Sequence, residues 1–445
     1  MRFVSRMTLA LLALAIPGTA CIAQNDSTRV WTLRQCIDYA IEHNITVQQM
    51  ENATHQNELD VNTAKWARLP NLNGSAGQDW RWGRSASPQS NGYINTQNAN
   101  SSVSLSTGVP LFTGLQIPYQ YALSKLNLKA ALEDLKNAKE NIAVNIAGAY
   151  LQALLNSELQ KVAQDQVVLS KEQADRIQGM FKVGKASQAE LADALSRVAQ
   201  DELLATQANN TYRLSILDLS QMLELPTPEG FALVGPQVGI DIQSLTPPDD
   251  IYAQALTFKP VVKAAEYRLQ GSEKSIRIAQ SAFYPQLSFS AGLGTSYYTL
   301  SGQGTPSFST QLKNNFSKYI AFNLSVPLFN RFATRNRVRS ARIQKLNYSL
   351  DLDNVKKTLY KEIQQAWYNA LAAESKYTSS TAAEESSTVA FQLMTEKFEN
   401  GKANAVEYNE SKQNLMKAQS DELQAKYEYL FRTKILDFYK GQAIE

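Results

Sequence analysis

Two long segments of this chain repeat one another, one in each half of the sequence. Residues 109–112 read Val-Pro-Leu-Phe, and the same four residues return at 326–329. Residues 181–186 read Phe-Lys-Val-Gly-Lys-Ala, and residues 398–403, at the same offset, read Phe-Glu-Asn-Gly-Lys-Ala. A third match, Ala67–Leu72 with Ala282–Leu287, has an offset that is shorter by two positions. We call this correspondence the repeat alignment. It predicts two copies of one structural unit, related by an approximate symmetry axis.

The N-terminal stretch 1–23 has the features of an export signal. A positively charged start precedes a short apolar run over residues 7–17, and small residues follow as far as Ala23. Because the run is too short to span a bilayer, we expect residues 1–23 to be a signal peptide that is cleaved after Ala23. A second interpretation makes Cys21 a lipid-modified first residue of the mature chain.

Composition gives no support to an enzyme or to a nucleic-acid-binding protein. The 445 residues include 44 Lys and Arg and 41 Asp and Glu, a balance that does not favour nucleic acid as a partner. The two histidines, His43 and His55, accompany no nucleophile motif, metal-ligand spacing or phosphate-binding loop. We therefore predict no catalytic residue, no metal site and no cofactor. Cys36 shares a helical face with apolar residues and is predicted to be a buried, inert thiol.

The first copy contains a predicted β-hairpin at about 72–112. Apolar and small residues alternate with polar ones over 74–82 and again over 103–111, which indicates two strands. The polar stretch 83–100 lies between them and is predicted to be a long loop. Each strand has about ten residues, enough to cross a bilayer as a tilted β-strand.

The second copy repeats this hairpin at about 287–328, with a predicted polar loop near 299–315. Aromatic residues gather towards the loop ends of both hairpins, as in the interfacial girdles of membrane barrels: Trp80, Trp82, Tyr297, Tyr298, Phe316, Tyr319 and Phe322. A soluble β-hairpin with surface aromatics is the alternative that the strands alone leave open.

After each hairpin the apolar period changes from 2 to 3.5, which is typical of a coiled-coil seam. The helical pattern runs from about 116 to 184 and from about 333 to 400, so each helix is expected to be roughly 100 Å long. Gly184 and Gly401 are expected to end these helices as left-handed caps, and a returning helix follows each. The predicted units are thus residues 24–225, a proline-rich linker at 226–248, and residues 249–445.

Four strands per chain cannot close a barrel. An open strand edge in lipid leaves backbone groups unpaired, at several kcal/mol each. A membrane protein built from these strands therefore needs several chains in one barrel, eight strands from two copies or twelve from three. The fold class that we predict is mainly α with membrane β: four strands per chain, continued by long coiled-coil helices.

The combination resembles the TolC-type family of outer-membrane efflux channels over essentially the whole mature chain. The resemblance rests on the paired strand-end prolines Pro70 and Pro285, the repeated Val-Pro-Leu-Phe, and the two glycine hairpins. It implies a homotrimer in the outer membrane of a Gram-negative-type cell, with a twelve-stranded barrel in lipid and a helical tunnel in the periplasm. A belt formed by 32–45, 225–259 and the C-terminus after Tyr439 would surround that tunnel. A periplasmic adaptor and an inner-membrane pump are the implied partners.

The resemblance also implies two groups of functional residues at the helix turns. The adaptor-contacting tips would be Val183, Gly184 and Lys185 in the first copy and Gly401 and Lys402 in the second. Both lysines depart from the apolar or small polar residue of the family pattern, which puts the family's tip contact in doubt and makes a charge-assisted contact the expectation. Solvated lysines beside two plain helix caps are the alternative.

The second group concerns the gate. By resemblance, Glu407 and Glu410 would line the narrowest part of the tunnel, where six carboxylates in a trimer would attract cations. Glu190 would make an inter-helix contact in the closed state. Phe398 and Ala403 stand where some members have Tyr and Arg, so this closed state must be held by other contacts. Two solvated glutamates are the alternative for the gate pair.

The predicted function is a passive exit duct of a tripartite efflux or type I secretion-like system, gated at its periplasmic end. The alternative from another class is a periplasmic coiled-coil scaffold without a pore, with or without a lipid anchor at Cys21. That alternative accounts for the helices and the signal, but leaves the two membrane-length hairpins unexplained.

Overall fold

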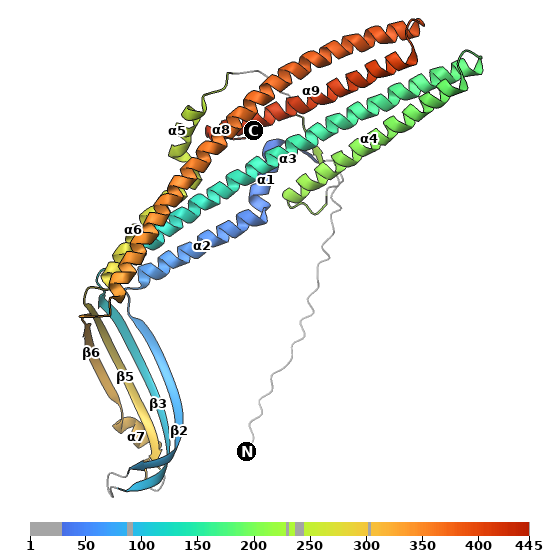
Figure 1. Ribbon diagram of the computed structural model, residues 1–445. Helices are drawn as coiled ribbons and strands as arrows, with labels where there is room; N and C mark the ends of the chain where they lie inside the picture. Colours follow the sequence, from blue (N-terminus) through green and yellow to red (C-terminus); the bar gives the residue numbers. More distant parts are fainter. Residues whose placement is uncertain (1–28, 87–91, 228–230, 236–243, 301–303, 445) are drawn as a thin grey trace, which may run out of the picture.

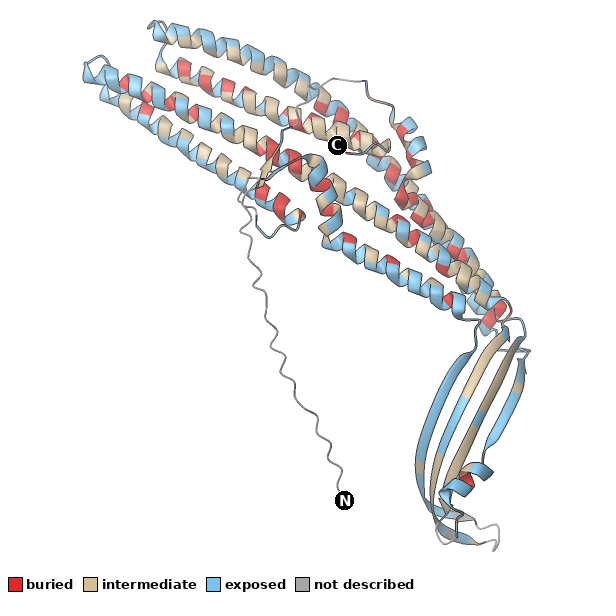
Figure 2. Ribbon diagram, turned by 180° about the vertical axis from the view of Figure 1, so that it is seen from behind, coloured by how far each residue is buried: buried red, intermediate tan, exposed pale blue. Residues whose placement is uncertain are grey.

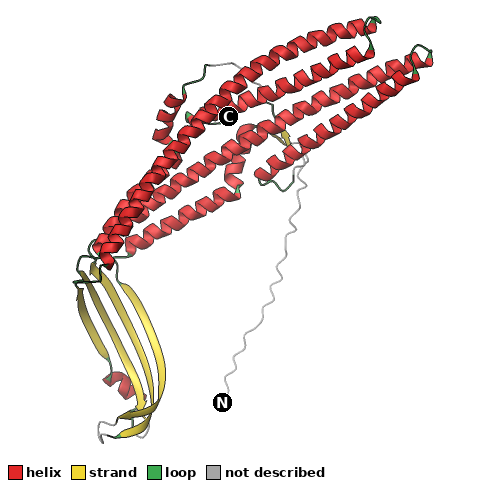
Figure 3. Cartoon of the chain, in the orientation of Figure 1, coloured by secondary structure: helices red, strands yellow, loops and turns green. Residues whose placement is uncertain are grey.

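The computed structural model describes residues 29–86, 92–227, 231–235, 244–300 and 304–444. The expected signal peptide at 1–23, with Cys21, lies outside these residues. The protein is elongated, with a β-sheet at one end and long helices that lead away from it (Figures 1 and 3). The fold class predicted from the sequence, mainly helical with four long strands, is confirmed.

The four long strands form one antiparallel sheet in the order β2-β3-β5-β6. They are β2 (Asn71–Ala86), β3 (Tyr93–Phe112), β5 (Gln286–Leu300) and β6 (Ser317–Ser325). Residues paired across neighbouring strands share a face of the sheet. The register therefore collects the large apolar side chains on one face: Leu72, Trp80 and Trp82 from β2, Val103, Leu105 and Val109 from β3, Leu287, Phe289 and Leu293 from β5, and Ile320, Phe322 and Leu324 from β6.

The opposite face of the sheet is polar. It carries mainly Ser, Asn and Gly, among them Asn73, Ser75, Ser102, Ser104, Ser288, Ser290 and Asn323. Almost the whole sheet is exposed or half-exposed in the single chain, whereas buried residues lie along the helices (Figure 2). A sheet with one bare apolar face and one polar face fits lipid on one side and water on the other.

The prediction of a loop over the whole of 83–100 was wrong. The strands continue with a regular register as far as the pair Ala86 and Tyr93, so most of this polar stretch is β-structure. Backbone hydrogen bonds between strands do not require apolar side chains. A strand with polar residues on both faces therefore shows no alternation of apolar and polar residues in its sequence.

The connection between β5 and β6 contains a short helix, α7 (Phe308–Asn314), where the sequence predicted a loop near 299–315. The side chain of Gln311 accepts from the backbone N–H of Tyr298 at 3.1 Å and donates to its carbonyl oxygen at 2.9 Å. Strand β6 pairs with β5 only as far as Gly294. The side-chain amide of Gln311 thus makes the two hydrogen bonds to Tyr298 that a residue of a longer β6 would make.

A layer of four helices continues the sheet with the same order of neighbours. Helix α2 (Ile45–Trp66) packs on α3 (Gln116–Lys182), α3 packs on α6 (Pro260–Ser281), and α6 packs on α8 (Ala333–Glu399). The layer order α2-α3-α6-α8 matches the strand order, because each helix joins the strand beside it. One end of the helical layer is therefore α2 and the other is α8 (Figure 1).

The two longest helices each make a hairpin with a returning helix. Helices α3 and α8 have 67 residues each, about 100 Å at 1.5 Å per residue. They turn into α4 (Gln188–Met222) and α9 (Ala405–Tyr439), which have 35 residues each. The helix ends predicted near 184 and 400 are confirmed to within two residues. No helix in the described ranges is long and apolar enough to cross a membrane.

The duplication holds element by element. Helices α1 (Leu33–His43) and α5 (Pro248–Phe258) have 11 residues each, and their starts are related by the same offset as Pro70 and Pro285. After the hairpins the offset is that of Val109 and Val326, as between the starts of α3 and α8. The two additional residues of the second copy therefore lie in its β-hairpin. The hairpin registers also correspond, because Asn71 pairs with Gly108 and Gln286 pairs with Ser325.

A small core midway along the helices joins the N-terminus to the segment between the two copies. Strand β1 (Arg29–Trp31) pairs in parallel with β4 (Phe231–Leu233), a strand within the predicted linker 226–248 that the sequence did not reveal. The hydroxyl oxygen of Tyr150 lies 3.0 Å from the carbonyl oxygen of Trp31 and 2.7 Å from that of Val234, so its one proton is shared between these two acceptors. Cys36 is fully buried here, as predicted, and burial raises the pKa of its thiol to about 12.

Candidate functional site at the helical hairpin tips

Both hairpin tips are built by the same backbone motif. Gly184 and Gly401 have φ of +73° and +68°, the left-handed region that costs other L-residues about 1–2 kcal/mol. At the first tip the N–H of Gly184 bonds to the carbonyl of Phe181 at 2.9 Å, and the N–H of Lys185 bonds to that of Met180 at 2.8 Å. The second tip has the equivalent pair of bonds. These are Schellman caps, so the predicted role of both glycines as helix caps is confirmed.

The returning helices begin with capping boxes, and these engage two of the predicted functional carboxylates. The backbone N–H of Ser187 donates to Glu190 at 2.6 Å, and that of Asn404 donates to Glu407 at 3.0 Å. In return, the side chains of Ser187 and Asn404 accept from the backbone N–H groups of the two glutamates. The hydrogen bonds from Ser187 lower the pKa of Glu190 below its ordinary value.

The predicted adaptor-contacting residues lie at the extreme end of the molecule. Val183 is 68% exposed, and Lys185 and Lys402 are also exposed. A Cβ placed on Gly184 or Gly401 would meet no atom within 4 Å, so both tips are open on the outside. The tips are therefore available to a partner, and each presents an exposed lysine directly after its glycine.

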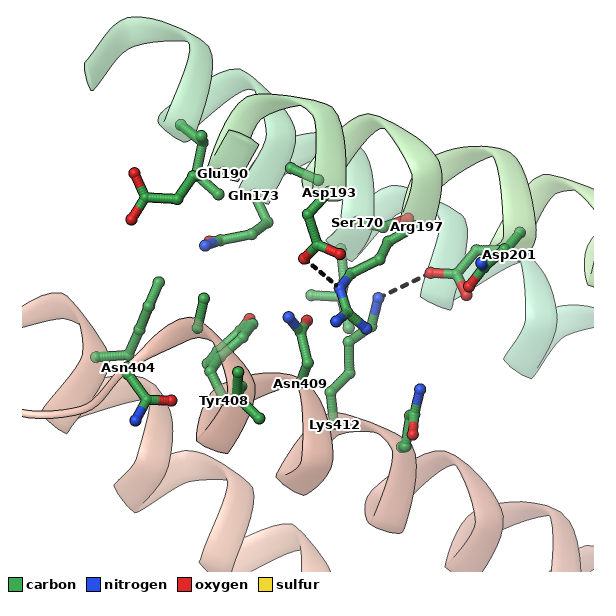
Figure 4. Close-up of a pocket in the computed structure, with 18 of the residues that line it drawn as sticks. Ser170, Gln173, Glu190, Asp193, Arg197, Asp201, Asn404, Tyr408, Asn409 and Lys412 are labelled. Carbon is green, nitrogen blue, oxygen red and sulfur yellow. Dashed lines mark hydrogen bonds and ion pairs between the residues drawn. The ribbon is translucent and has the colours of Figure 1, made fainter. Parts of the chain in front are cut away.

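A groove of about 740 Å³ separates the two hairpins behind their tips (Figure 4). Helices α3 and α4 form one wall, and α9 with the end of α8 forms the other. Glu190, predicted to make an inter-helix contact, lines the groove and forms its hydrogen bonds with Ser187 in its own capping box. Glu407 and Glu410 are exposed and are not among its lining residues, although Val406, Tyr408 and Asn409 on the same turns of α9 are. The structure thus separates Glu190 from the pair at 407 and 410.

Lys412 crosses the groove from α9 to the other hairpin. Its Nζ donates to Oδ2 of Asp201 on α4 at 3.0 Å and to the carbonyl oxygen of Gln166 on α3 at 3.2 Å. The side chains of Lys412 and Asp201 are only 11% and 18% exposed, so water screens this pair less than a surface pair. Figure 4 shows Lys412 pointing across the groove towards Asp201.

Two further contacts join the hairpins or brace the tip. Arg176 on α3 pairs with Glu399 at the end of α8 at 2.9 Å. Within the second hairpin, the rings of Phe398 and Tyr408 stack with centroids 4.8 Å apart. Burial raises the pKa of the Tyr408 phenol. Phe398 has no hydroxyl group that could donate a hydrogen bond, so its contribution is the ring contact with Tyr408.

Lys412, Asp201 and Tyr408 were missed at the level of sequence. A signal was available, because Tyr408, Lys412 and Leu415 are spaced by four and three residues, and all three are buried. Lys412 thus occupies a coiled-coil core position, where a charge requires a partner. The position of that partner, 211 residues away in the sequence, could not be read from the pattern.

The two histidines lie far from these tips. His43 stacks on Tyr39 with ring centroids 3.9 Å apart, and His55 pairs with Glu58 at 3.2 Å. Within the described ranges, no group of three or more His, Cys, Asp or Glu could hold a metal ion. The chemistry at the tips is therefore that of helix caps, a bridging lysine and exposed charges.

Comparisons with known proteins agree with this architecture. The family described as outer membrane efflux protein matches residues 36–224 and 251–441. The outer membrane efflux protein BepC of Brucella suis biovar 1 is 20% identical over 372 residues, which cover 82% of this chain and 75% of BepC.

Solved structures show the same fold. The CmeC outer membrane channel of Campylobacter jejuni superposes with a TM-score of 0.77 at 19% identity, over 93% of this chain and 86% of CmeC. The outer membrane protein VceC of Vibrio cholerae gives a TM-score of 0.76 at 15% identity, over 93% of this chain and 97% of VceC.

Proposed function

The chain belongs to the outer membrane efflux protein family, and we propose that three copies form one continuous duct that lets exported substrate leave the cell. The family places the protein in the outer membrane as an efflux channel. We further propose that the assembly is a trimer, that its gate lies at the hairpin tips, and that its partners are a periplasmic adaptor and an inner-membrane pump.

The observation that carries the proposal is that sheet and helical layer are open at the same two edges. The outer strands are β2 and β6, and the outer helices are α2 and α8, which lie on the corresponding sides. The outer helices carry exposed apolar side chains among their polar ones: α2 exposes Ile45, Leu59 and Trp66, and α8 exposes Ile343, Leu346 and Leu350, all by more than half. A second copy in the same orientation can therefore cover the outer strand and the outer helix on one side, and a third copy can do the same on the other side.

Three copies supply twelve strands, an allowed number for a closed membrane barrel. Two copies would supply eight, and the interior of a barrel of that size is filled by side chains. A duct that must pass substrate therefore favours three. The apolar face of the sheet would then meet lipid, and the Ser- and Asn-rich face would line the pore.

We place the closed gate at the tips of the hairpins. Glu407 and Glu410, exposed and outside the groove, are the proposed constriction. This chain has Phe398 and Ala403 where some family members have Tyr and Arg. In their place, the ion pair between Lys412 and Asp201 would hold the two hairpins together. Opening would separate the hairpins, so it must break or stretch this pair.

Lys185 and Lys402 are proposed to contact a periplasmic adaptor, which in turn joins an inner-membrane pump. The described pore-facing residues of the sheet are mainly Ser, Asn and Gly, so we expect the pump to select the substrate. This protein would provide the exit path and no catalytic step.

Reconstitution tests the proposal against a periplasmic scaffold. The purified protein should migrate as a heat-modifiable oligomer from the outer-membrane fraction, and should give discrete single-channel currents in a planar bilayer. A soluble periplasmic protein without current would contradict it.

A further inference from the structure

The near-neutral composition of this chain conceals a strong separation of charge. Residues 61–132 contain six Lys and Arg with one acid, Asp79, and residues 274–350 contain ten Lys and Arg with none. The rest of the chain has 28 basic and 40 acidic residues. Both basic spans consist of the sheet and the helix ends that adjoin it. The membrane end is therefore strongly positive, and the remaining, mostly helical part is negative.

An amphipathic cleft lies in this positive region, at the elbow where β3 passes into α3. Its volume is about 460 Å³. Its apolar wall includes Leu111, Phe112 and Leu115, which are 50%, 42% and 52% exposed. Arg68 from the end of α2 and Tyr121 from α3 complete it. Three large apolar side chains that line a cleft and remain half-exposed indicate a surface that another molecule covers.

The apolar wall of the cleft adjoins the apolar face of the sheet at Phe112. Val109 on β3 pairs with Phe289, and both belong to the apolar face. A register shift after Pro110 then aligns Phe112 with Leu287, which is also on that face. The apolar wall of the cleft therefore continues the lipid-facing surface at the end nearest the helices.

The rim of the cleft is basic. Arg68 lies next to Lys65, and its Nε donates to the Lys65 carbonyl oxygen at 3.2 Å. Lys125 Nζ lies 4.4 Å from the centroid of the Tyr121 ring. A hydrogen bond with Lys125, together with the charges of Lys125, Lys65 and Arg68, lowers the pKa of the Tyr121 phenol. No ion pair among the described residues neutralises these three cations, so the rim is suited to an anion.

The second copy does not preserve this combination. In the repeat alignment, Phe283 corresponds to Arg68, and Val338 corresponds to Tyr121. Val338 is only 6% exposed, so this part of the second elbow is packed. The second copy keeps the exposed apolar residues, as Leu328, Phe329 and Phe332, but it lacks the arginine and the tyrosine that complete the cleft in the first copy.

We propose that the elbow cleft binds an anionic phospholipid of the periplasmic leaflet, with an acyl chain on Leu111, Phe112 and Leu115 and the phosphate at Arg68 and Lys125. Clusters of Lys and Arg beside a membrane segment attract anionic headgroups, and Trp and Tyr settle at the same level. This site goes beyond the proposed duct and depends only on the protein's place in the outer membrane.

Native mass spectrometry of the full-length protein in detergent tests the site. The micelles are titrated with dioleoylphosphatidylglycerol or with dioleoylphosphatidylcholine. We expect preferential binding of the anionic lipid. The double substitution Arg68→Gln and Lys125→Gln should weaken that binding roughly tenfold or more, since each cation near a headgroup contributes about 1 kcal/mol.

The matched control removes two charges elsewhere. Lys182→Gln with Lys397→Gln, two exposed lysines near the hairpin tips, should leave lipid binding unchanged. Equal binding of both lipids, or equal loss in both double variants, would overturn the proposal.

A second experiment distinguishes the lipid from a soluble anion. Leu115→Ser should weaken binding of phosphatidylglycerol, and soluble glycerophosphoglycerol should compete poorly with the intact lipid. Competition at equal concentration would show that the cleft takes soluble anions, and would overturn the assignment to lipid. Circular dichroism of each variant establishes that it is folded.

Discussion

Nζ of Lys412 lies 3.0 Å from Oδ2 of Asp201, and this pair ties the second helical hairpin to the first. Lys412 also reaches the backbone of α3 at Gln166, so one side chain from α9 holds both helices of the opposite hairpin. Asp193 and Arg197, by contrast, pair within α4 at 3.0 Å and hold only their own helix. The groove thus contains one ion pair that resists separation of the hairpins and one that does not.

The Lys412–Asp201 pair should restrain opening. Lys412→Met keeps the length of the side chain, removes its charge and leaves the mostly buried Asp201 carboxylate without a partner. We expect a loss of about 1–3 kcal/mol of closed-state stability, and therefore a higher open probability in single-channel recordings.

Arg197→Met is the matched control, because it removes a cation from the same groove without unlinking the hairpins. Its open probability should stay close to that of the unaltered protein. If Lys412→Met and Arg197→Met behave alike, the restraint does not depend on the pair between hairpins.

The exposed pair Glu407 and Glu410 should determine the response to cations. Replacing both by Ala removes six carboxylates from the proposed constriction of a trimer, so block by divalent cations should weaken severalfold in planar-bilayer recordings. Glu410 should contribute more than Glu407, whose carboxylate already accepts a backbone hydrogen bond from Asn404.

A control for this effect is Glu172→Ala with Asp175→Ala, an exposed pair with the same three-residue spacing on α3. Unchanged divalent block in the Glu407 and Glu410 double variant, or the same change in both, would refute the gate assignment.

The hairpin tips should be the adaptor-facing surface. Cysteine at 185 or 402, combined with a bifunctional thiol-to-amine crosslinker in cells, should capture a periplasmic adaptor. Cysteine at Asp250, an exposed position on α5, serves as the comparison. Capture only from position 250 would move the contact away from the tips.

Alkaline pH should destabilise the small core around Cys36 and Tyr150. Burial raises the thiol pKa from 9.0 to about 12 and the phenol pKa from 10.0 to about 12. Both groups ionise more readily in the unfolded chain, so their contribution to stability is intact below pH 9 and is lost as pH rises towards 12. The guanidinium midpoint of the unaltered protein should therefore fall more between pH 7.5 and pH 10.5 than that of Cys36→Ala. Equal falls would show that the thiol does not contribute.

The duplication made most of the helical architecture predictable. Seams with a period of 3.5 and the glycines at 184 and 401 located α3 and α8 to within two residues, because long periodic patterns average out local exceptions. The strands were found, but their lengths were not. Residues 83–86 and 93–100 pair through the backbone, although their sequence shows no regular alternation of apolar and polar residues. Strand β4 is very short and its partner β1 lies near the N-terminus, a pairing that no local pattern could reveal.

The candidate site was predictable only in part. The caps at Gly184 and Gly401 follow from local chemistry, and so did the positions of the exposed lysines beside them. The capping boxes are equally local, since Ser187 with Glu190 and Asn404 with Glu407 have the required three-residue spacing. The bridge from Lys412 depends on how two hairpins pack, and its partner cannot be derived from periodicity within one helix.

The most direct test of the central claim is a disulfide across the expected seam between copies. Within the chain, Gly108 on β3 pairs with Ser290 on β5. In the repeat alignment, Gly108 corresponds to Ser325 on β6 and Ser290 corresponds to Ser75 on β2, at opposite edges of the sheet. These edges are about 14 Å apart in one chain, too far for a disulfide.

A protein with cysteine at both Ser75 and Ser325 should therefore form covalent trimers on oxidation, seen on a non-reducing gel. Cysteines at Ser75 and Ala321, four residues out of register, should not. Trimers from the first pair alone would support a twelve-stranded duct built by joining β6 of one copy to β2 of the next. Monomers or a two-membered product from the first pair, or equal crosslinking by both pairs, would contradict it.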